Sequence, residues 1–129
     1  MFDTDIVSYL TKRPTDKLRN RYLNTAPGSY AISAINYAEI AFGLAALPSS
    51  HPMRLASRNF LETIQILDWP TEAASAYAAV RHQLRMQPIG DRDIMIAAHA
   101  IALDATLVTN NTRHFNRIGP PLRIENWLE

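Results

Sequence analysis

Apolar and polar positions along the chain follow two different periods. Short runs with the apolar, β-branched character of strands occur at residues 1–4, 30–33, 63–67, 105–109 and 122–125. The longer segments between these runs place apolar residues three or four positions apart, which is the period of an amphipathic helix. Strands that alternate with helices predict βαβ units and a mostly parallel sheet.

Several helices are predicted between the strands. One covers residues 33–46 with Ser33 as its N-cap, and another covers residues 71–87 with Thr71 as its N-cap. A break at residues 48–52 precedes a helix at residues 54–63. The segment 93–103 is apolar nearly all round, so we expect it to pack on several sides, with the sheet and a second subunit as candidate neighbours.

Size and composition place the chain in a broad class. Its 129 residues, 47% of them hydrophobic, fit one domain covering residues 1–129. The absence of cysteine excludes disulfides and thiolate metal sites. The N-terminus lacks the basic start and apolar run of a secretory signal, and no apolar segment approaches the length of a membrane span. We therefore expect a cytoplasmic protein that does not enter a membrane.

The basic residues are clustered although the formal net charge is only +1. One cluster is "KRPTDKLRNR", which contains Lys12, Arg13 and Lys17, and a second surrounds Arg113. For either cluster alone, a solvated helix face is the simpler explanation. Arginine outnumbers lysine, however, and its planar guanidinium favours bidentate contacts with phosphate. These four residues are therefore candidate contacts for a phosphate-rich partner.

Several carboxylates fall at positions that the pattern predicts to be buried. Asp3 closes the first strand, Glu39 interrupts an apolar helix, and Asp91 and Asp93 open the apolar segment near the C-terminus. Simpler roles exist for most of them, since Asp5, Asp91 and Asp93 could cap helices and Glu39 could pair with an arginine. Asp3 is the hardest to explain, because a carboxylate at the end of an apolar strand costs free energy unless a cation compensates it.

Together these residues form a candidate site with oxygen ligands only. Ligands bind at the carboxyl ends of strands in open α/β sheets, where Ser33, Thr109 and Asn111 are also found. Hard oxygen ligands without histidine or cysteine suit Mg²⁺ or Mn²⁺, and such an ion can activate water and stabilise charge on a phosphodiester. His99, on an apolar segment, is interpreted as a hydrogen-bonded core residue rather than a ligand. The residues therefore favour metal-assisted phosphoryl chemistry.

Two other interpretations use the same acidic start. "DTDIV" fits the signature of haloacid-dehalogenase-type phosphatases, with Asp3 as nucleophile and Asp5 as general acid. A non-enzymatic receiver-like signalling domain also has acidic residues near its first strand. Both need a lysine after a later strand, whereas the only lysines here are Lys12 and Lys17. "GDRD" is a loose match to the later acidic motif of the phosphatases, but the chain is also short for that fold.

A resemblance covers nearly the whole sequence. "FDTDIVSYL", "ISAINYAEIAFGL" and "PIGDRDIMIAAHAIALDATLVTNNTRHFNRIGPPLRIENW" resemble, in order, the three main motifs of PIN-domain ribonucleases. The similarity is greatest to the VapC toxins of bacterial toxin–antitoxin pairs. The last motif is specific because it combines an acidic helix start, "IAAHA", "LVTNN" and a closing "ENW".

The resemblance implies a magnesium- or manganese-dependent endoribonuclease that cleaves structured RNA such as tRNA. Asp3, Glu39 and Asp93 would surround the metal, with Glu39 as a ligand or as the group that orients the attacking water, and Asn111 would fill the fourth polar position of the family. The supporting residues implied are Thr4, Asp5, Ser33, Asp91 and Thr109. Relatives often have Asn at the position of Asp5, a residue other than Asp at Asp91, and an acid at Asn111 and at His114.

The resemblance also implies an architecture and partners. The expected fold is a three-layer α/β/α sandwich with a mostly parallel central sheet. The expected partners are an RNA substrate, a second copy of the chain in a homodimer, and a cognate VapB-type antitoxin whose C-terminal tail covers the active site. The apolar helices would supply the grooves for both protein partners.

Overall fold

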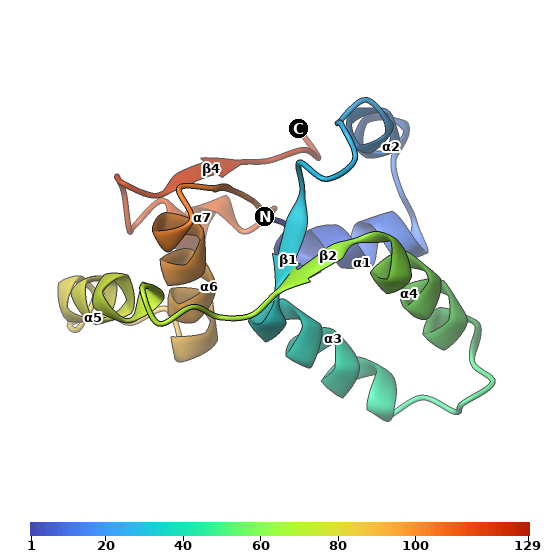
Figure 1. Cartoon of the computed structure of the whole chain (residues 1–129), viewed down its shortest axis with the longest axis horizontal. Coiled ribbons are helices and arrows are strands. Elements are labelled where there is room, and N and C mark those ends of the chain that lie inside the picture. Colours follow the sequence, from blue (N-terminus) through green and yellow to red (C-terminus); the bar gives the residue numbers. More distant parts are fainter.

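The computed structural model describes residues 1–129 and contains seven helices and four short strands (Figure 1). The strands are β1 (Ala31–Ser33), β2 (Gln65–Leu67), β3 (Thr106–Val108) and β4 (Arg123–Glu125). The helices are α1 (Thr4–Lys12), α2 (Asp16–Leu23), α3 (Ala34–Ala45), α4 (Pro52–Thr63), α5 (Ala73–Gln83), α6 (Asp91–Ala102) and α7 (Thr112–Phe115). None of these helices is long and apolar enough to span a membrane.

The N-terminal segment, residues 1–3, lies between two pairs of parallel strands and forms hydrogen bonds with both pairs. β1 pairs with β2, and β3 pairs with β4, both in parallel. Between the pairs, the Phe2 amide donates to the Ala31 carbonyl and the Asp3 amide donates to the Val108 carbonyl, each at 2.9 Å. The predicted parallel arrangement is therefore confirmed. The first strand is shorter than predicted because α1 already begins at Thr4.

Helices cover both faces of this strand array. In the N-terminal segment and in β3, consecutive residues face opposite sides of the array and belong to different hydrophobic cores. Met1 and Leu107 belong to a core with α5, α6 and α7, whereas Phe2 and Val108 belong to a second core with residues of α1 to α4. Figure 1 shows these two groups of helices on either side of the strands. The expected α/β/α sandwich is thus the observed arrangement.

Some helix ends differ from the predicted ones. Ser33 caps α3 as predicted, and its side chain accepts from the Ile35 amide at 3.1 Å. Thr71 was predicted to cap the next long helix, but this is wrong because α5 begins at Ala73. The backbone carbonyls of Pro70 and Thr71 accept the first amides of that turn, so no side-chain cap is used.

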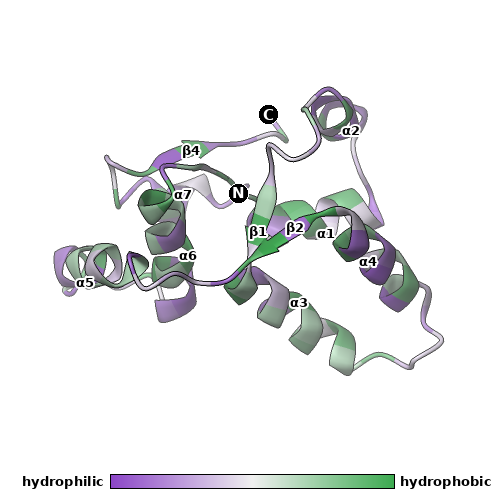
Figure 2. Cartoon of the chain, in the orientation of Figure 1, coloured by the Kyte–Doolittle hydropathy of each residue, from purple (hydrophilic) through white to green (hydrophobic).

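Two further helices carry little hydrophobic signal. α2 is mostly hydrophilic (Figure 2), and Leu18 is its one buried residue. α7 is a single turn that buries Phe115. An amphipathic pattern needs several turns to be recognisable, so neither helix was predicted from apolar spacing.

Candidate active site

Asp3 lies where the N-terminal segment ends and α1 begins. It is only 7% exposed, and its Oδ1 accepts from the Thr4 amide at 2.8 Å. Thr109 donates its hydroxyl to Asp3 Oδ2, also at 2.8 Å. Burial raises the pKa of Asp3, the hydrogen bonds oppose this rise, and the charge of Asp93 adds to it. Asp3, not Asp5 as the simpler sequence interpretation held, is therefore the N-cap of α1.

Glu39 projects from α3 toward the same region. Its Oε1 accepts from the Thr4 hydroxyl at 3.3 Å, and its Oε2 lies 3.8 Å from a guanidinium nitrogen of Arg92. Burial raises the pKa of Glu39, Arg92 lowers it, and the charges of Asp3 and Asp93 raise it again. Glu39 thus has the arginine partner that the sequence suggested, but it also faces the other acids.

Asp93 lies in the first turn of α6 without capping it. Gly90 is the N-cap, with a φ of 104° that favours glycine, and no side-chain capping bond is present. Asp93 Oδ2 lies 3.3 Å from His114 Nδ1, and Asn111 Nδ2 lies 3.0 Å from the same nitrogen. The Asn111 amide in turn donates to the Thr109 hydroxyl at 2.9 Å. The segment after β3 therefore contacts both Asp3 and Asp93.

Asp5 adds a fourth carboxylate at the edge of this group. Its Oδ2 accepts from the Asn110 amide at 3.0 Å, while its buried Oδ1 has no hydrogen-bond partner. Burial, followed by the charge of Asp3 and more weakly that of Asp93, raises the pKa of Asp5 to about 6. A buried carboxylate oxygen without a donor is consistent with a cation or a water at this place.

Other predicted site residues lie further out. Asp91 is not brought to the acidic group, because its side chain is exposed and lies 3.8 Å from Arg81. The Ser33 hydroxyl lies 2.8 Å from Nδ1 of His99, which is fully buried and is the hydrogen-bonded core histidine that was predicted. His99 Nε2 has no partner, and burial lowers the pKa of His99. Ser33 therefore supports the site from behind rather than lining it.

The predicted basic residues lie on three elements. Lys12 and Arg13 line a hollow of about 540 Å³ together with Asp5, so they border the acidic group. Lys17 is exposed on α2, and Arg113 is on α7 beside His114. The first pair is thus the one that the structure places next to the carboxylates.

Sequence reasoning missed two neighbours of the carboxylates, Arg92 and Asn36. Asn36 is fully buried in α3, and its Nδ2 donates to the Thr4 hydroxyl at 3.0 Å and to Asp3 Oδ1 at 3.4 Å. A signal was available, since an asparagine in an apolar helix three residues before Glu39 lies on the same helix face.

The donor set fits a divalent cation, although the acids are spread out. All the acidic donors are oxygens, and three of the carboxyl groups have raised pKa values partly because they repel one another. No three His, Asp or Glu side chains are grouped tightly enough to form a complete metal site by themselves. Mg²⁺ commonly uses one or two carboxylates and keeps several waters, so this spacing suits a partly hydrated ion.

Comparison with known proteins identifies the family. The profile described as "PIN domain" matches residues 1–120. The chain belongs to the PIN-domain family. This PIN domain is 36% identical to Ribonuclease VapC2 of Rickettsia felis over 98% of the chain and 96% of that protein. It is also 36% identical to the tRNA(fMet)-specific endonuclease VapC of Shigella flexneri, with the same coverage.

The solved structures agree with this assignment. A crystal structure of VapBC2 from Rickettsia felis, bound to a DNA fragment from its promoter, matches this PIN domain with a TM-score of 0.89 and 35% identity. The match covers 98% of this chain and 97% of that one. The predicted resemblance and fold are therefore confirmed, and the phosphatase and receiver interpretations are not favoured.

Proposed function

We propose that this PIN domain is a VapC-type toxin, an endoribonuclease that hydrolyses phosphodiester bonds in structured RNA such as tRNA with the help of Mg²⁺ or Mn²⁺. The observation that carries the proposal is the meeting of Asp3, Glu39 and Asp93, which come from three separate elements and influence one another electrostatically. The names of the two relatives, a ribonuclease and a tRNA(fMet)-specific endonuclease, support the substrate class.

Each acidic residue has a role that its contacts support. Asp3 and Asp93 would hold the metal directly or through water. Asn111 lies beside His114, which in turn contacts Asp93. When bound, the ion supplies charge stabilisation at the phosphate and lowers the pKa of a water. Glu39 has a raised pKa and stands beside the ligands, so it can orient a water and accept its proton. Arg92, 3.8 Å from Glu39, offers a cation for the phosphate.

The basic residues beside the site give RNA a place to bind. Lys12 and Arg13 border the hollow next to Asp5, and Arg113 and Lys17 extend the positive charge onto α7 and α2. Contacts of this kind neutralise RNA phosphates and make binding weaker at high salt. We assign these four residues to substrate binding in the cytoplasm, where tRNA would be met.

The test of the proposal is metal-dependent cleavage. We expect the purified protein to cut total tRNA in the presence of Mg²⁺ or Mn²⁺, and excess chelator should abolish cleavage because carboxylates alone cannot stabilise the charge on the phosphate. The measurement is gel electrophoresis of the tRNA, with Ca²⁺ replacing Mg²⁺ as a control for charge alone. Full cleavage in excess chelator would contradict the metal mechanism.

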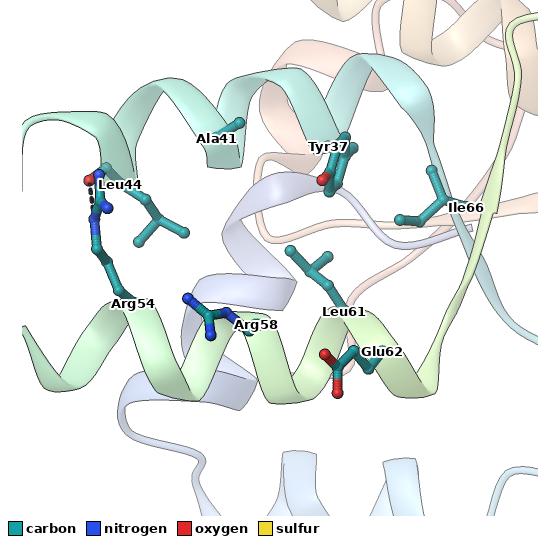
Figure 3. Close-up of a pocket in the computed structure, with 8 residues that line it drawn as sticks. All are labelled: Tyr37, Ala41, Leu44, Arg54, Arg58, Leu61, Glu62 and Ile66. Carbon is teal, nitrogen blue, oxygen red and sulfur yellow. Dashed lines mark hydrogen bonds between the residues drawn. The ribbon is translucent and has the colours of Figure 1, made fainter. Parts of the chain in front are cut away.

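An antitoxin of the VapB type is the proposed protein partner, as in the VapBC complexes among the solved structures. A groove of about 410 Å³ lies between α3 and α4. Figure 3 shows Tyr37, Leu44 and Leu61 pointing into it. Figure 2 shows that α3 is hydrophobic along most of its length. Such an exposed apolar face suits a protein partner, and we assign the apolar helices to the antitoxin and to a homodimer contact.

The Asp5→Asn variant tests whether the charge of Asp5 lowers the stability of the folded protein without being needed for RNA cleavage. Because the folded-state pKa of Asp5 is about 6 against an ordinary value of 3.8, the folded protein binds more protons than the unfolded chain between these pH values. Ionisation of Asp5 thus destabilises the metal-free protein as pH rises from 4 through 6. Asp5→Asn should remove this loss, worth on the order of 1 kcal/mol after allowance for partial exposure.

The measurement is urea unfolding of metal-free wild type and Asp5→Asn from pH 4 to pH 8. The difference in unfolding free energy should grow up to about pH 7 and then level off. The variant should still cleave RNA, since its amide oxygen can accept from Asn110 as the carboxylate does. A loss of cleavage of about 10²-fold or more would instead make Asp5 a general acid.

A further inference from the structure

We propose that Asn36 is a positioning residue for this site, with an amide group that fixes which oxygen of Asp3 can reach the metal and which way the Thr4 hydroxyl points. This inference rests on the metal site of the proposed function. Asn36 is fully buried in the first turn of α3, behind Asp3 and Thr4. It has no place in the reaction itself, so its effect must pass through these two neighbours.

Hydrogen bonding allows only one orientation of the Asn36 amide. Its Oδ1 accepts from the Ser33 backbone amide at 3.3 Å, which completes the capping box of α3. Its Nδ2 therefore faces Asp3 Oδ1 and the Thr4 hydroxyl, and both hydrogens of the group are used. A flipped amide would place an oxygen against the Asp3 carboxylate and leave the Ser33 amide without an acceptor.

The first consequence concerns Asp3. Oδ1 already accepts two hydrogen bonds, from the Thr4 amide at 2.8 Å and from Asn36 at 3.4 Å. Oδ2 accepts only one, from Thr109 at 2.8 Å. Each carboxylate oxygen can accept about two such interactions, so the remaining position is on Oδ2. Asn36 thereby directs Asp3 to bind a cation through one oxygen.

The second consequence concerns Thr4 and Glu39. The Thr4 hydroxyl accepts from Asn36 at 3.0 Å, and because Nδ2 can only donate, the hydroxyl hydrogen is free to point to Glu39 Oε1 at 3.3 Å. Hydrogen bonds thus run in one direction from Asn36 through Thr4 to Glu39. This series of hydrogen bonds holds the Glu39 carboxylate, which would orient the attacking water.

The anchor of this arrangement lies deeper in the protein. The Ser33 hydroxyl accepts from the Ile35 amide and lies 2.8 Å from His99 Nδ1 on α6. Ser33 and His99 are both fully buried. α6 also carries Asp93, so the Ser33–His99 contact connects the helix of Glu39 to the helix of Asp93. Asn36, which accepts from the Ser33 amide, is therefore anchored in a buried and hydrogen-bonded part of the fold.

Asn36→Ala should weaken Mn²⁺ binding by about 10- to 100-fold, the usual effect of removing a residue that orients a metal ligand. The measurement is calorimetric titration of the metal-free protein with Mn²⁺, which needs no RNA. In tRNA cleavage at saturating Mn²⁺, kcat should fall while KM for RNA stays the same, because Asn36 is buried away from the substrate. Asn59→Ala, at an exposed asparagine of α4, is the matched control and should leave both unchanged.

A double-mutant comparison tests the route through Thr4. Asn36 reaches Glu39 only by way of the Thr4 hydroxyl, so in a Thr4→Val background the further loss of kcat on changing Asn36→Ala should be smaller than in the wild type. Equal losses in both backgrounds would show that Asn36 acts without Thr4 and would overturn this part of the proposal.

The wild-type protein offers a test that does not depend on folding of a variant. Addition of Mg²⁺ should shift the side-chain amide resonances of Asn36 in NMR spectra, whereas those of exposed Asn59 should not move. An Asn36→Ala protein that binds Mn²⁺ as the wild type does, or Asn36 resonances unmoved in a wild type that binds Mg²⁺, would overturn the inference. A wild type that binds neither ion would refute the proposed metal site and this inference with it.

Discussion

Asp93→Asn is expected to reduce RNA cleavage by at least about 10²-fold while leaving the metal-free protein as stable as the wild type or slightly more stable. Asp93 raises the pKa of Asp3, Asp5 and Glu39, so its charge opposes theirs in the folded state. Removing that charge relieves repulsion but takes away a proposed metal ligand. Added Mn²⁺ should therefore stabilise the variant less than it stabilises the wild type.

The measurement combines tRNA cleavage with melting temperatures recorded with and without Mn²⁺. Asp91→Asn is the matched control, because Asp91 is in the same helical turn but its side chain is exposed beside Arg81. That control should leave cleavage and the response to Mn²⁺ close to wild type, since exposed ion pairs contribute little. If Asp93→Asn remained active and responsive to Mn²⁺, Asp93 would not belong to the metal site.

The contrast between Asp91 and Asp93 shows what the sequence could and could not predict. Both were expected at the start of a buried helix, and α6 does begin there. Residues two apart on a helix point in different directions, so only one of them could face Asp3. The strand and helix periods determine the position of the helix along the chain, whereas its rotation about its own axis depends on packing against α5 and β3.

The polar contacts around the acids depend even more strongly on packing. Ser33 was predicted as a cap from its place before an apolar helix, and that local role is confirmed. Its contact with His99 joins residues 66 positions apart, and no spacing rule connects them. Asn36 was overlooked for the same reason, since its importance comes from Thr4 and Asp3, which lie more than thirty residues earlier in the chain.

The position of Asp3 itself depends on its neighbour Phe2, and Phe2→Ala should therefore have the largest effect on stability. Phe2 is fully buried; its ring lies 5.4 Å from that of Tyr30 and 5.2 Å from that of Trp127. Truncation of such a residue removes aromatic contacts and leaves a cavity, at a cost of about 3–5 kcal/mol. Urea unfolding followed by tryptophan fluorescence measures the loss.

Phe42→Ala is the matched control, since Phe42 is 79% exposed on α3 and its loss should change the unfolding free energy of the isolated protein by no more than about 0.5 kcal/mol. Phe2→Leu should lie between the two, because leucine refills part of the cavity. If Phe2→Ala cost no more than Phe42→Ala, the N-terminal segment would not be held between β1 and β3. Asp3 would then lack the fixed position on which the whole proposed site depends.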